Sequence, residues 1–272
     1  MRVIVCIKQI LAVKRVHLDQ HNNLMREGIP GVMNPADKRA LEFALNLREQ
    51  QSEPVEIIAL SMGPNDSEQS LRQALSLGVD RGILLSSRAF GGADTLATAN
   101  TLVAGINKIG NADLILLGAK SQDADTGQVG PLIASKLDIP QVTYISELSL
   151  QPSPSYVTAR REAADGIEEI QVGLPAVCTV AVNRDTERES QKYPTLMQLR
   201  KSMEADLTIW NEKDLGVDVN TVGINGSPTV VTRVFSPQPP ERKHIALPED
   251  PKTAVDELLK QLPANSKIRD AR

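Results

Sequence analysis

The small and polar residues at positions 118–130 (GAKSQDADTGQVG) are the segment best suited to bind a ligand. They follow the apolar run 114–117 and lead into a predicted helix over 126–137. Unpaired N–H groups and the positive dipole end make a helix N-terminus an anion site, so the segment favours a phosphate or pyrophosphate. The same residues also suit a capped loop with Asp123 or Asp125 as the N-cap.

A second candidate is the segment 90–98 (FGGADTLAT). Its glycine pair would let the backbone lie flat against a ring, and Asp94 and Thr95 would supply hydrogen bonds. Taken alone, the segment is better explained by Asp94 as an ordinary N-cap. Neither segment has the Gly-Lys-Ser/Thr ending of a Walker loop or the Gly-x-Gly-x-x-Gly pattern after the first strand.

Few side chains elsewhere suggest chemistry of their own. Lys8 directly follows the apolar run 3–7, which suits either a phosphate contact or a charge at a strand end. Cys6 has only apolar neighbours and is predicted to be an inert core residue. Two cysteines and three scattered histidines predict neither a disulfide framework nor a metal site. There is no Gly-x-Ser-x-Gly nucleophile motif.

The elements that would position these segments alternate along the first 148 residues. Apolar runs predict strands over 3–7, 55–60, 82–85, 114–117 and 140–145, and apolar stripes predict helices over 35–48, 66–77, 94–109 and 126–137. Continuous apolar strands are buried on both faces. The alternation therefore predicts an α/β fold with a parallel sheet and helices on both of its faces, and ligands at the carboxyl ends of the strands.

The pattern changes after Leu150. Asp165-Gly166 predicts a hairpin turn between strands over 156–161 and 168–172, a further strand is predicted over 176–182, and a short helix over 194–203. From Leu215 onward no apolar stripe occurs until residues 252–262. Such a tail cannot bury a core of its own, so it is either disordered or wraps a partner, and the late helix favours wrapping.

Composition excludes several classes of function. The net charge of −4 and the pI of about 5.5 argue against a nucleic-acid-binding protein. No apolar run approaches the length of a membrane helix and no signal peptide is evident, so we expect a cytoplasmic protein. Aromatic residues make up only 3% of the chain. Function is therefore expected to rest on backbone geometry and small polar groups.

Taken together, the segments resemble the small (β) subunit of electron transfer flavoproteins over essentially the whole chain. Each matching motif is weak alone, but their order and spacing are highly specific. The resemblance rests on residues 5–9 (VCIKQ), 33–37 (MNPAD), 61–64 (SMGP), 74–85 (ALSLGVDRGILL), 123–131 (DADTGQVGP), 140–143 (PQVT), 174–176 (LPA), 193–196 (YPTL) and 214–218 (DLGVD).

The resemblance implies a heterodimer with a larger α subunit that carries an FAD. The β subunit would have a Rossmann-like parallel sheet, similar to adenine-nucleotide hydrolase and universal-stress folds, with small β additions and an extended C-terminal arm. It implies a nucleotide-binding domain over 1–190, a dehydrogenase-docking segment over 191–205 and an arm wrapping the α subunit over 206–272.

Two branches of the family differ in what the β subunit binds. Most members hold AMP, which is structural, while the electron-bifurcating branch holds a second FAD. Residues 88–98 and 125–131 resemble the bifurcating branch. That branch would take electrons from NADH and pass them to the α-subunit FAD with an acyl-CoA-type dehydrogenase, and to a low-potential ferredoxin or flavodoxin. Ala119-Lys120 and Ala124 depart from the family pattern of phosphate and ring contacts.

The resemblance also assigns roles to individual residues. Those implied to bind the nucleotide are Cys6, Ile7 and Lys8 at the adenine end, Asn34 and Met62 along it, Gly118, Asp125, Thr126, Gly127, Gln128 and Val129 at the phosphates, and Asp94, Thr95 and Thr98 near an isoalloxazine ring. Tyr193 and Leu196 are implied to dock the dehydrogenase, with Leu196 as the anchor; ordinary helix packing is the alternative for Leu196.

Overall fold

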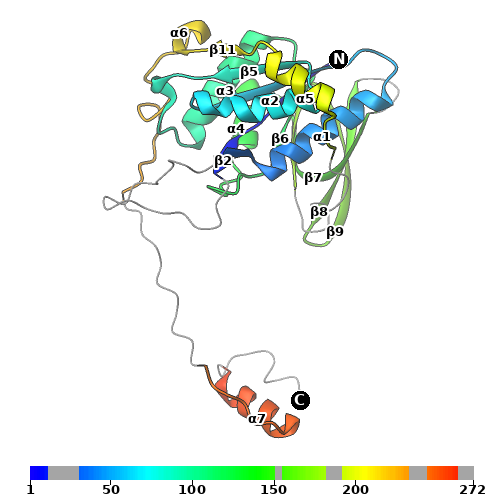
Figure 1. Cartoon of the computed structure of the whole chain (residues 1–272), viewed down its shortest axis with the longest axis vertical. Coiled ribbons are helices and arrows are strands. Elements are labelled where there is room, and N and C mark those ends of the chain that lie inside the picture. Colours follow the sequence, from blue (N-terminus) through cyan, green and yellow to red (C-terminus); the bar gives the residue numbers. More distant parts are fainter. Residues whose placement is uncertain (12–30, 151–154, 182–191, 233–243, 263–272) are drawn as a thin grey trace. The chain divides into compact units, whose positions relative to one another are not determined.

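The computed structural model describes residues 1–11, 31–150, 155–181, 192–232 and 244–262. The chain divides into two compact units, Met1–Thr232 and Arg233–Arg272 (Figure 1). The predicted boundary between residues 190 and 191 lies outside the described residues, as do His17 and His21. Residues 206–232, predicted as the first part of the arm, belong to the first unit.

The first unit is built on a nine-stranded sheet in the order β11-β5-β4-β1-β6-β10-β7-β8-β9. The strands are β1 (Arg2–Cys6), β4 (Glu56–Met62), β5 (Arg81–Leu85), β6 (Leu114–Gly118), β7 (Gln141–Leu150), β8 (Tyr156–Ala163), β9 (Gly166–Gly173), β10 (Ala176–Val180) and β11 (Thr208–Trp210). Pairing is parallel from β11 to β7 and antiparallel in the β7-β8-β9 extension at one end of the sheet (Figure 1). A separate antiparallel pair joins β2 (Gln9–Leu11) to β3 (Gly31–Met33).

Helices cover both faces of the sheet because its strands are apolar on both sides. The helices of this unit are α1 (Pro35–Gln50), α2 (Glu68–Ser76), α3 (Thr95–Ile109), α4 (Val129–Leu137), α5 (Leu196–Glu204), α6 (Glu212–Leu215) and the 3₁₀ turns η1 (Asn65–Ser67) and η2 (Arg88–Phe90). One core cluster joins α1 and α2 to alternate strand residues such as Val3 and Val5, and the other joins α3 and α4 to Ile4 and Cys6. Successive residues of β1 therefore face opposite cores.

The topology creates a switch point beside β1. The chain leaves β1 through α1 to β4 on one side, continues through α2 to β5, and returns through α3 to β6 on the other side of β1. Loops that leave the carboxyl ends of strands on opposite sides of such a point diverge and open a crevice. We call the carboxyl ends of β1, β4, β5 and β6, with the described loops that follow them, the ligand edge.

The predicted parallel α/β fold is confirmed, with two corrections. The helix predicted from residue 126 begins at Val129, because Asp125 (φ 55°) and Gly127 (φ 65°) have left-handed backbones that an α-helix cannot include. The sheet also gains β11, a strand not predicted from the sequence, which pairs with β5. Three residues are too few to give an alternating apolar pattern.

The described part of the second unit contains α7 (Pro251–Gln261), close to the predicted helix over 252–262. Asp250 caps it by accepting hydrogen bonds from the N–H and hydroxyl of Thr253, at 2.9 and 2.7 Å. Val255 and Leu258 are exposed on this helix. Among the described residues of the whole chain, no helix is long and apolar enough to span a membrane.

Candidate functional site

A buried carboxylate, Asp37, joins the two strands that flank the switch point. Its Oδ2 accepts the Lys8 N–H just after β1 at 2.8 Å, and its Oδ1 accepts the Gly118 N–H at the end of β6, also at 2.8 Å. Burial raises the pKa of Asp37 to about 6, although the two N–H donors favour the ionised form. Gly118 approaches so closely that a Cβ there would lie 2.6 Å from Asp37 Oδ1.

Asn34 and Lys8 hold the start of the loop that follows β6. The Asn34 amide donates to the Lys120 carbonyl at 3.1 Å and accepts from the Gln122 N–H at 3.2 Å. The Lys8 ammonium forms an ion pair with Asp123 at 2.8 Å. Burial alone would raise the pKa of Asp123, but the hydrogen bonds from Lys8 and Ser121 and the charge of Lys8 together hold it below its ordinary value. Lys8, predicted either at a phosphate or as a strand-end charge, thus lies at the ligand edge and pairs with the loop.

The loop over 119–128 leads into the N-terminus of α4 at the ligand edge. α4 begins after Gln128, which makes no side-chain cap hydrogen bond among the described residues, and the first turn of α4 has no acidic residue. Asp123 and Asp125, the predicted alternatives for the N-cap, instead pair with Lys8 and Lys120. An uncapped N-terminus without a local negative charge fits an anionic group such as a phosphate.

The glycine-rich segment after β5 meets this loop. The Thr95 hydroxyl donates to Gln128 Oε1 at 2.8 Å, so the two candidate segments form one continuous surface. Asp94 caps α3 by accepting the Ala97 N–H at 3.0 Å. Its other carboxylate oxygen accepts from the Thr229 hydroxyl at 2.9 Å. Asp94 is thus an N-cap, as its position predicts, and Thr95 is the side chain that reaches the neighbouring loop.

A C-terminal segment, 218–229, is fastened to the same glycine-rich segment. The Asp94 N–H donates to Ser227 Oγ at 2.8 Å, and the Ile224 N–H donates to the Gly91 carbonyl at 2.9 Å. A Cβ at Gly92, whose φ is 69°, would lie 3.3 Å from the Ile224 side chain. The path of the segment therefore fixes how the Gly91-Gly92 turn lies at the ligand edge.

The remaining predicted binding residues also lie along the ligand edge, with different exposure. Cys6 ends β1 and is buried, and burial raises the pKa of its thiol to about 12, as expected of an inert core cysteine. Ile7 is buried and its N–H donates to the Leu60 carbonyl at 2.8 Å. Met62 ends β4 and is half-buried. Thr98, Thr126 and Val129 are placed in the first turn of α3, in the exposed part of the loop and at the first position of α4, respectively.

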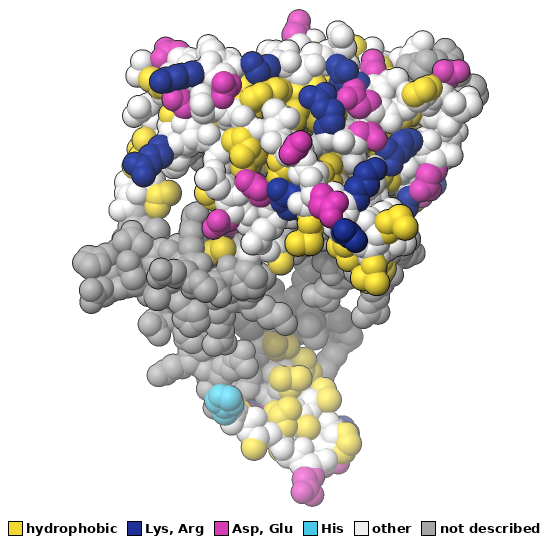
Figure 2. All heavy atoms as spheres, turned by 45° about the horizontal axis from the view of Figure 1, so that its top comes forward, with side chains coloured by type: hydrophobic (Ala, Val, Ile, Leu, Met, Phe, Trp, Pro, Cys, Tyr) yellow, Lys and Arg dark blue, Asp and Glu magenta, His cyan; other side chains and the backbone are white. Residues whose placement is uncertain are grey.

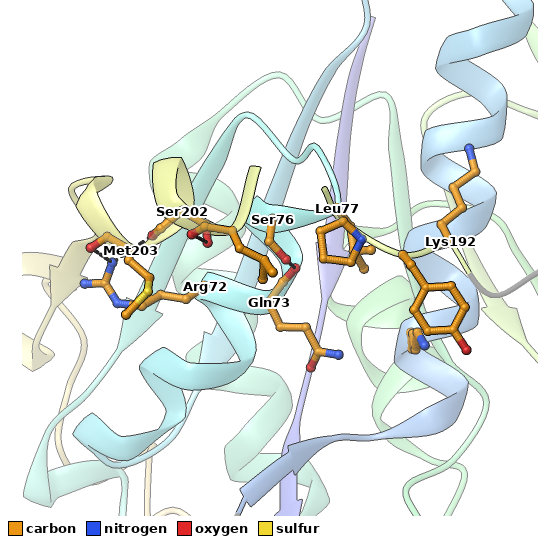
Figure 3. A pocket seen from close by; sticks show the side chains of 11 residues that line it. Arg72, Gln73, Ser76, Leu77, Lys192, Ser202 and Met203 are labelled. Atoms are coloured by element: carbon orange, nitrogen blue, oxygen red, sulfur yellow. Dashed lines mark hydrogen bonds between the residues drawn. The ribbon is translucent and has the colours of Figure 1, made fainter. Parts of the chain in front are cut away.

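The two predicted docking residues lie elsewhere, at the start of α5, which packs against α2. Thr195 caps α5 in a reciprocal capping box with Gln198. At the other end, Arg72 donates to the carbonyls of Ser202 and Met203, both at 3.0 Å, as Figure 3 shows. This guanidinium satisfies carbonyls that a helix C-terminus leaves unpaired.

The surface around α5 is apolar and partly hollowed. Leu196 is 85% exposed, Met197 82% and Met203 74%. A hollow of about 370 Å³ is lined by Met203 together with Arg72 and Lys192, among others (Figure 3). On the face drawn in Figure 2, acidic and basic side chains are otherwise interspersed. Exposed apolar side chains in one patch mark an interaction surface rather than a core.

Sequence reasoning missed two residues of the site. Asp37 was noted only within the 33–37 motif, because an acidic residue in the first turn of a helix usually just complements the helix dipole. Tyr144, whose hydroxyl lies beside Gly127, was missed because nothing in the sequence 140–145 signals its left-handed backbone (φ 58°).

Comparison with known proteins gives a consistent result. Residues 22–204 match the model of the electron transfer flavoprotein domain. The chain is 40% identical to the caffeyl-CoA reductase-Etf complex subunit CarD of Acetobacterium woodii, over 87% of this chain and 88% of that protein. It is 39% identical to protein FixA of Sinorhizobium fredii, over 91% and 87%. It is 38% identical to the electron transfer flavoprotein subunit beta of Clostridium acetobutylicum, over 86% and 87%.

Proposed function

Because the chain belongs to the electron transfer flavoprotein family and is a β-type subunit, we propose that it binds FAD at the ligand edge and works in electron bifurcation. In this proposal the αβ heterodimer takes electrons from NADH. One electron goes through the α-subunit FAD to an acyl-CoA-type dehydrogenase, and the other goes to a low-potential ferredoxin or flavodoxin.

The observation that carries the proposal is the hydrogen bond between Thr95 and Gln128. It brings the 119–128 loop and the glycine-rich segment together, so that both could contact one ligand that extends beyond an adenylate. The similarity to CarD, a subunit of a complex with a reductase, supports the same branch. The flavin would supply the redox chemistry, as cofactors do, while the protein binds and orients it.

Each part of the ligand edge has its own role in this proposal. Backbone groups of Cys6 to Lys8, with Asn34 and Met62, hold the adenine end. The N–H groups at the start of α4 bind the phosphates, aided by Gly118 and residues 125–129, where small residues permit close approach. Thr95 and Thr98 face the ring, and Asp94 keeps the turn in place.

The test is the nucleotide content of the purified αβ complex. The complex is denatured, and FAD and AMP are counted by absorbance and chromatography. Two FAD and no AMP per heterodimer are expected, after which NADH should reduce the complex. One FAD and one AMP per heterodimer would contradict FAD binding by this subunit and would establish the second candidate.

The second candidate is a structural subunit that holds AMP and docks the dehydrogenase while the α subunit carries the only FAD. It is supported by Asp94, which is already engaged as an N-cap and by Thr229, and so is not set aside for a ring contact. In this candidate Asn34, Met62 and the 119–128 loop would hold the adenylate.

In both candidates α5 docks the dehydrogenase, and Leu196→Ala tests it. We expect electron transfer to the dehydrogenase to fall by about tenfold or more, since apolar anchors at interface centres commonly contribute about 2 kcal/mol. Because Leu196 is 85% exposed, the melting temperature should stay within about 2 °C of the wild-type value.

The matched control for this prediction is Ile167→Ala. Ile167 is 65% exposed on β9, at the far end of the sheet. Its replacement by alanine should leave electron transfer unchanged. Steady-state reduction of the dehydrogenase at varied αβ concentrations gives the readout. Equal rates for Leu196→Ala and wild type would show that Leu196 is not the anchor.

A further inference from the structure

Tyr144 has a backbone conformation that its residue type strongly disfavours. Its φ is 58°, in the left-handed region. The other described non-glycine residues with positive φ are Asn111, Asp125, Asp138 and His244, which belong to the types that tolerate this region. A bulky side chain there costs free energy and persists only where the surroundings impose it.

The surroundings of Tyr144 do impose it. The pairing of β7 shifts register on both sides, between Cys178 and Val180 on β10 and between Ile145 and Glu147 on β7 where it meets β8. The Tyr144 N–H leaves the regular ladder and donates to the Thr179 hydroxyl at 3.0 Å. Bulges of this kind redirect a side chain, and they occur often beside functional sites.

The redirected side chain reaches the loop over 119–128. Tyr144 is 43% exposed, and a Cβ at Gly127 would lie 3.1 Å from its hydroxyl oxygen. Gly127 and Asp125 are themselves left-handed, so three such positions meet at this point of the ligand edge. The phenol is one of few aromatic rings in a chain with 3% aromatic residues.

We propose that Tyr144 is a positioning residue for the nucleotide. The kink in β7 places its phenol against Gly127, and this contact holds residues 125–128 where the first N–H groups of α4 face the ligand phosphates. The strain at Tyr144 is retained because it serves binding and not stability. The inference rests on nucleotide binding at the ligand edge, and it holds for AMP and FAD alike because both present phosphate there.

The test uses the αβ complex with the α-subunit FAD retained and only the nucleotide of this subunit removed, titrated separately with AMP and with FAD. Tyr144→Asn removes the phenol and supplies a residue that accepts a left-handed backbone. We expect the Kd of the nucleotide that the wild type binds to rise by about tenfold, while the melting temperature of the depleted complex stays equal or rises. Tyr144→Phe keeps the ring and should raise Kd only by about two- to threefold.

A second measurement tests the contact between Tyr144 and Gly127 by changing Gly127. Gly127→Ala places a Cβ against the phenol, so it should weaken binding more in the wild-type background than in Tyr144→Asn. Tyr156→Asn, on β8, is the control for loss of a tyrosine and should leave Kd unchanged.

The outcomes separate this inference from the proposed function. A wild-type complex whose β subunit binds neither AMP nor FAD overturns both. Wild-type affinity in Tyr144→Asn overturns the role of Tyr144 alone. The role of Tyr144 is also overturned if Tyr144→Asn both raises the Kd and lowers the melting temperature. An equal effect of Gly127→Ala on Kd in both backgrounds has the same meaning, because Tyr144 would then be an ordinary packing residue.

Discussion

Replacing Asp37 by asparagine is expected to lower the free energy of unfolding by about 2 kcal/mol and to reduce nucleotide content. The two carboxylate oxygens accept the N–H groups of Lys8 and Gly118, each at 2.8 Å. An amide has one oxygen, so its NH₂ group would meet the second N–H and leave a buried donor unpaired, which costs about 1–3 kcal/mol. The melting temperature of the αβ complex should fall by about 4–8 °C.

The effect of this substitution depends on pH. Burial raises the pKa of Asp37 from 3.8 to about 6, so the folded state binds this proton more tightly than the unfolded state. Wild-type stability therefore gains from Asp37 protonation at low pH, and loses up to about 3 kcal/mol as the pH rises from 4 through 6. Asp37→Asn lacks this titration. The difference in free energy of unfolding between wild type and Asp37→Asn should therefore narrow as the pH rises from 5 to 7.

Thermal melts of both proteins across that pH range provide the measurement. Asp113→Asn is the control, since Asp113 accepts the Arg2 N–H at the amino ends of the parallel strands, away from the ligand edge. It should leave the nucleotide content unchanged. A constant deficit for Asp37→Asn at all pH values would mean that Asp37 does not titrate in this window.

Gly118→Ala is the second large effect that we expect. A Cβ at this position would lie 2.5 Å from the Ala36 Cβ and 2.9 Å from the Ala36 carbonyl carbon, in addition to its approach to Asp37. Backbone cannot move aside as a side chain tip can, so α1 and β6 must separate. Overpacking of this kind costs about 1–3 kcal/mol, and breaking the Asp37 hydrogen bond adds to it.

Denaturant unfolding of the complex, with nucleotide counted in parallel, measures this effect. Gly173→Ala is the matched control, because the nearest atom to a Cβ there is the Ser155 carbonyl oxygen at 4.0 Å. The control should stay within about 0.5 kcal/mol of wild type. If Gly118→Ala unfolds as the control does, then α1 and β6 are not in close contact at the ligand edge.

How much of the fold could be predicted depends on the length of the pattern. The helix predicted over 35–48 occurs at Pro35–Gln50, since many apolar positions repeat along it. The start of α4 was placed three residues early because glycine and aspartate in 125–127 gave no sign of their left-handed backbones. β11 was missed because Thr208–Trp210 is too short for a period and forms only by pairing with β5.

The candidate site was predictable where it consists of loops and not where it depends on contacts between distant segments. The 118–130 segment stood out by its composition. The link between Asp37 and Gly118 spans 81 positions, and the link between Asp94 and Thr229 spans 135, so neither leaves a local pattern in the sequence. Only the folding of the whole unit brings these distant groups together.

The ends of the sheet decide where another chain can attach. A bare strand edge invites a further strand, and with it aggregation. Here β5 is covered by β11, which offers only three residues for pairing and passes at once into α6. At the opposite edge, β9 carries Glu169 beside the ion pair of Glu168 with Arg161, and charged side chains on an edge strand discourage pairing with a second copy. Both strand edges of the sheet therefore disfavour the addition of a further strand from another chain.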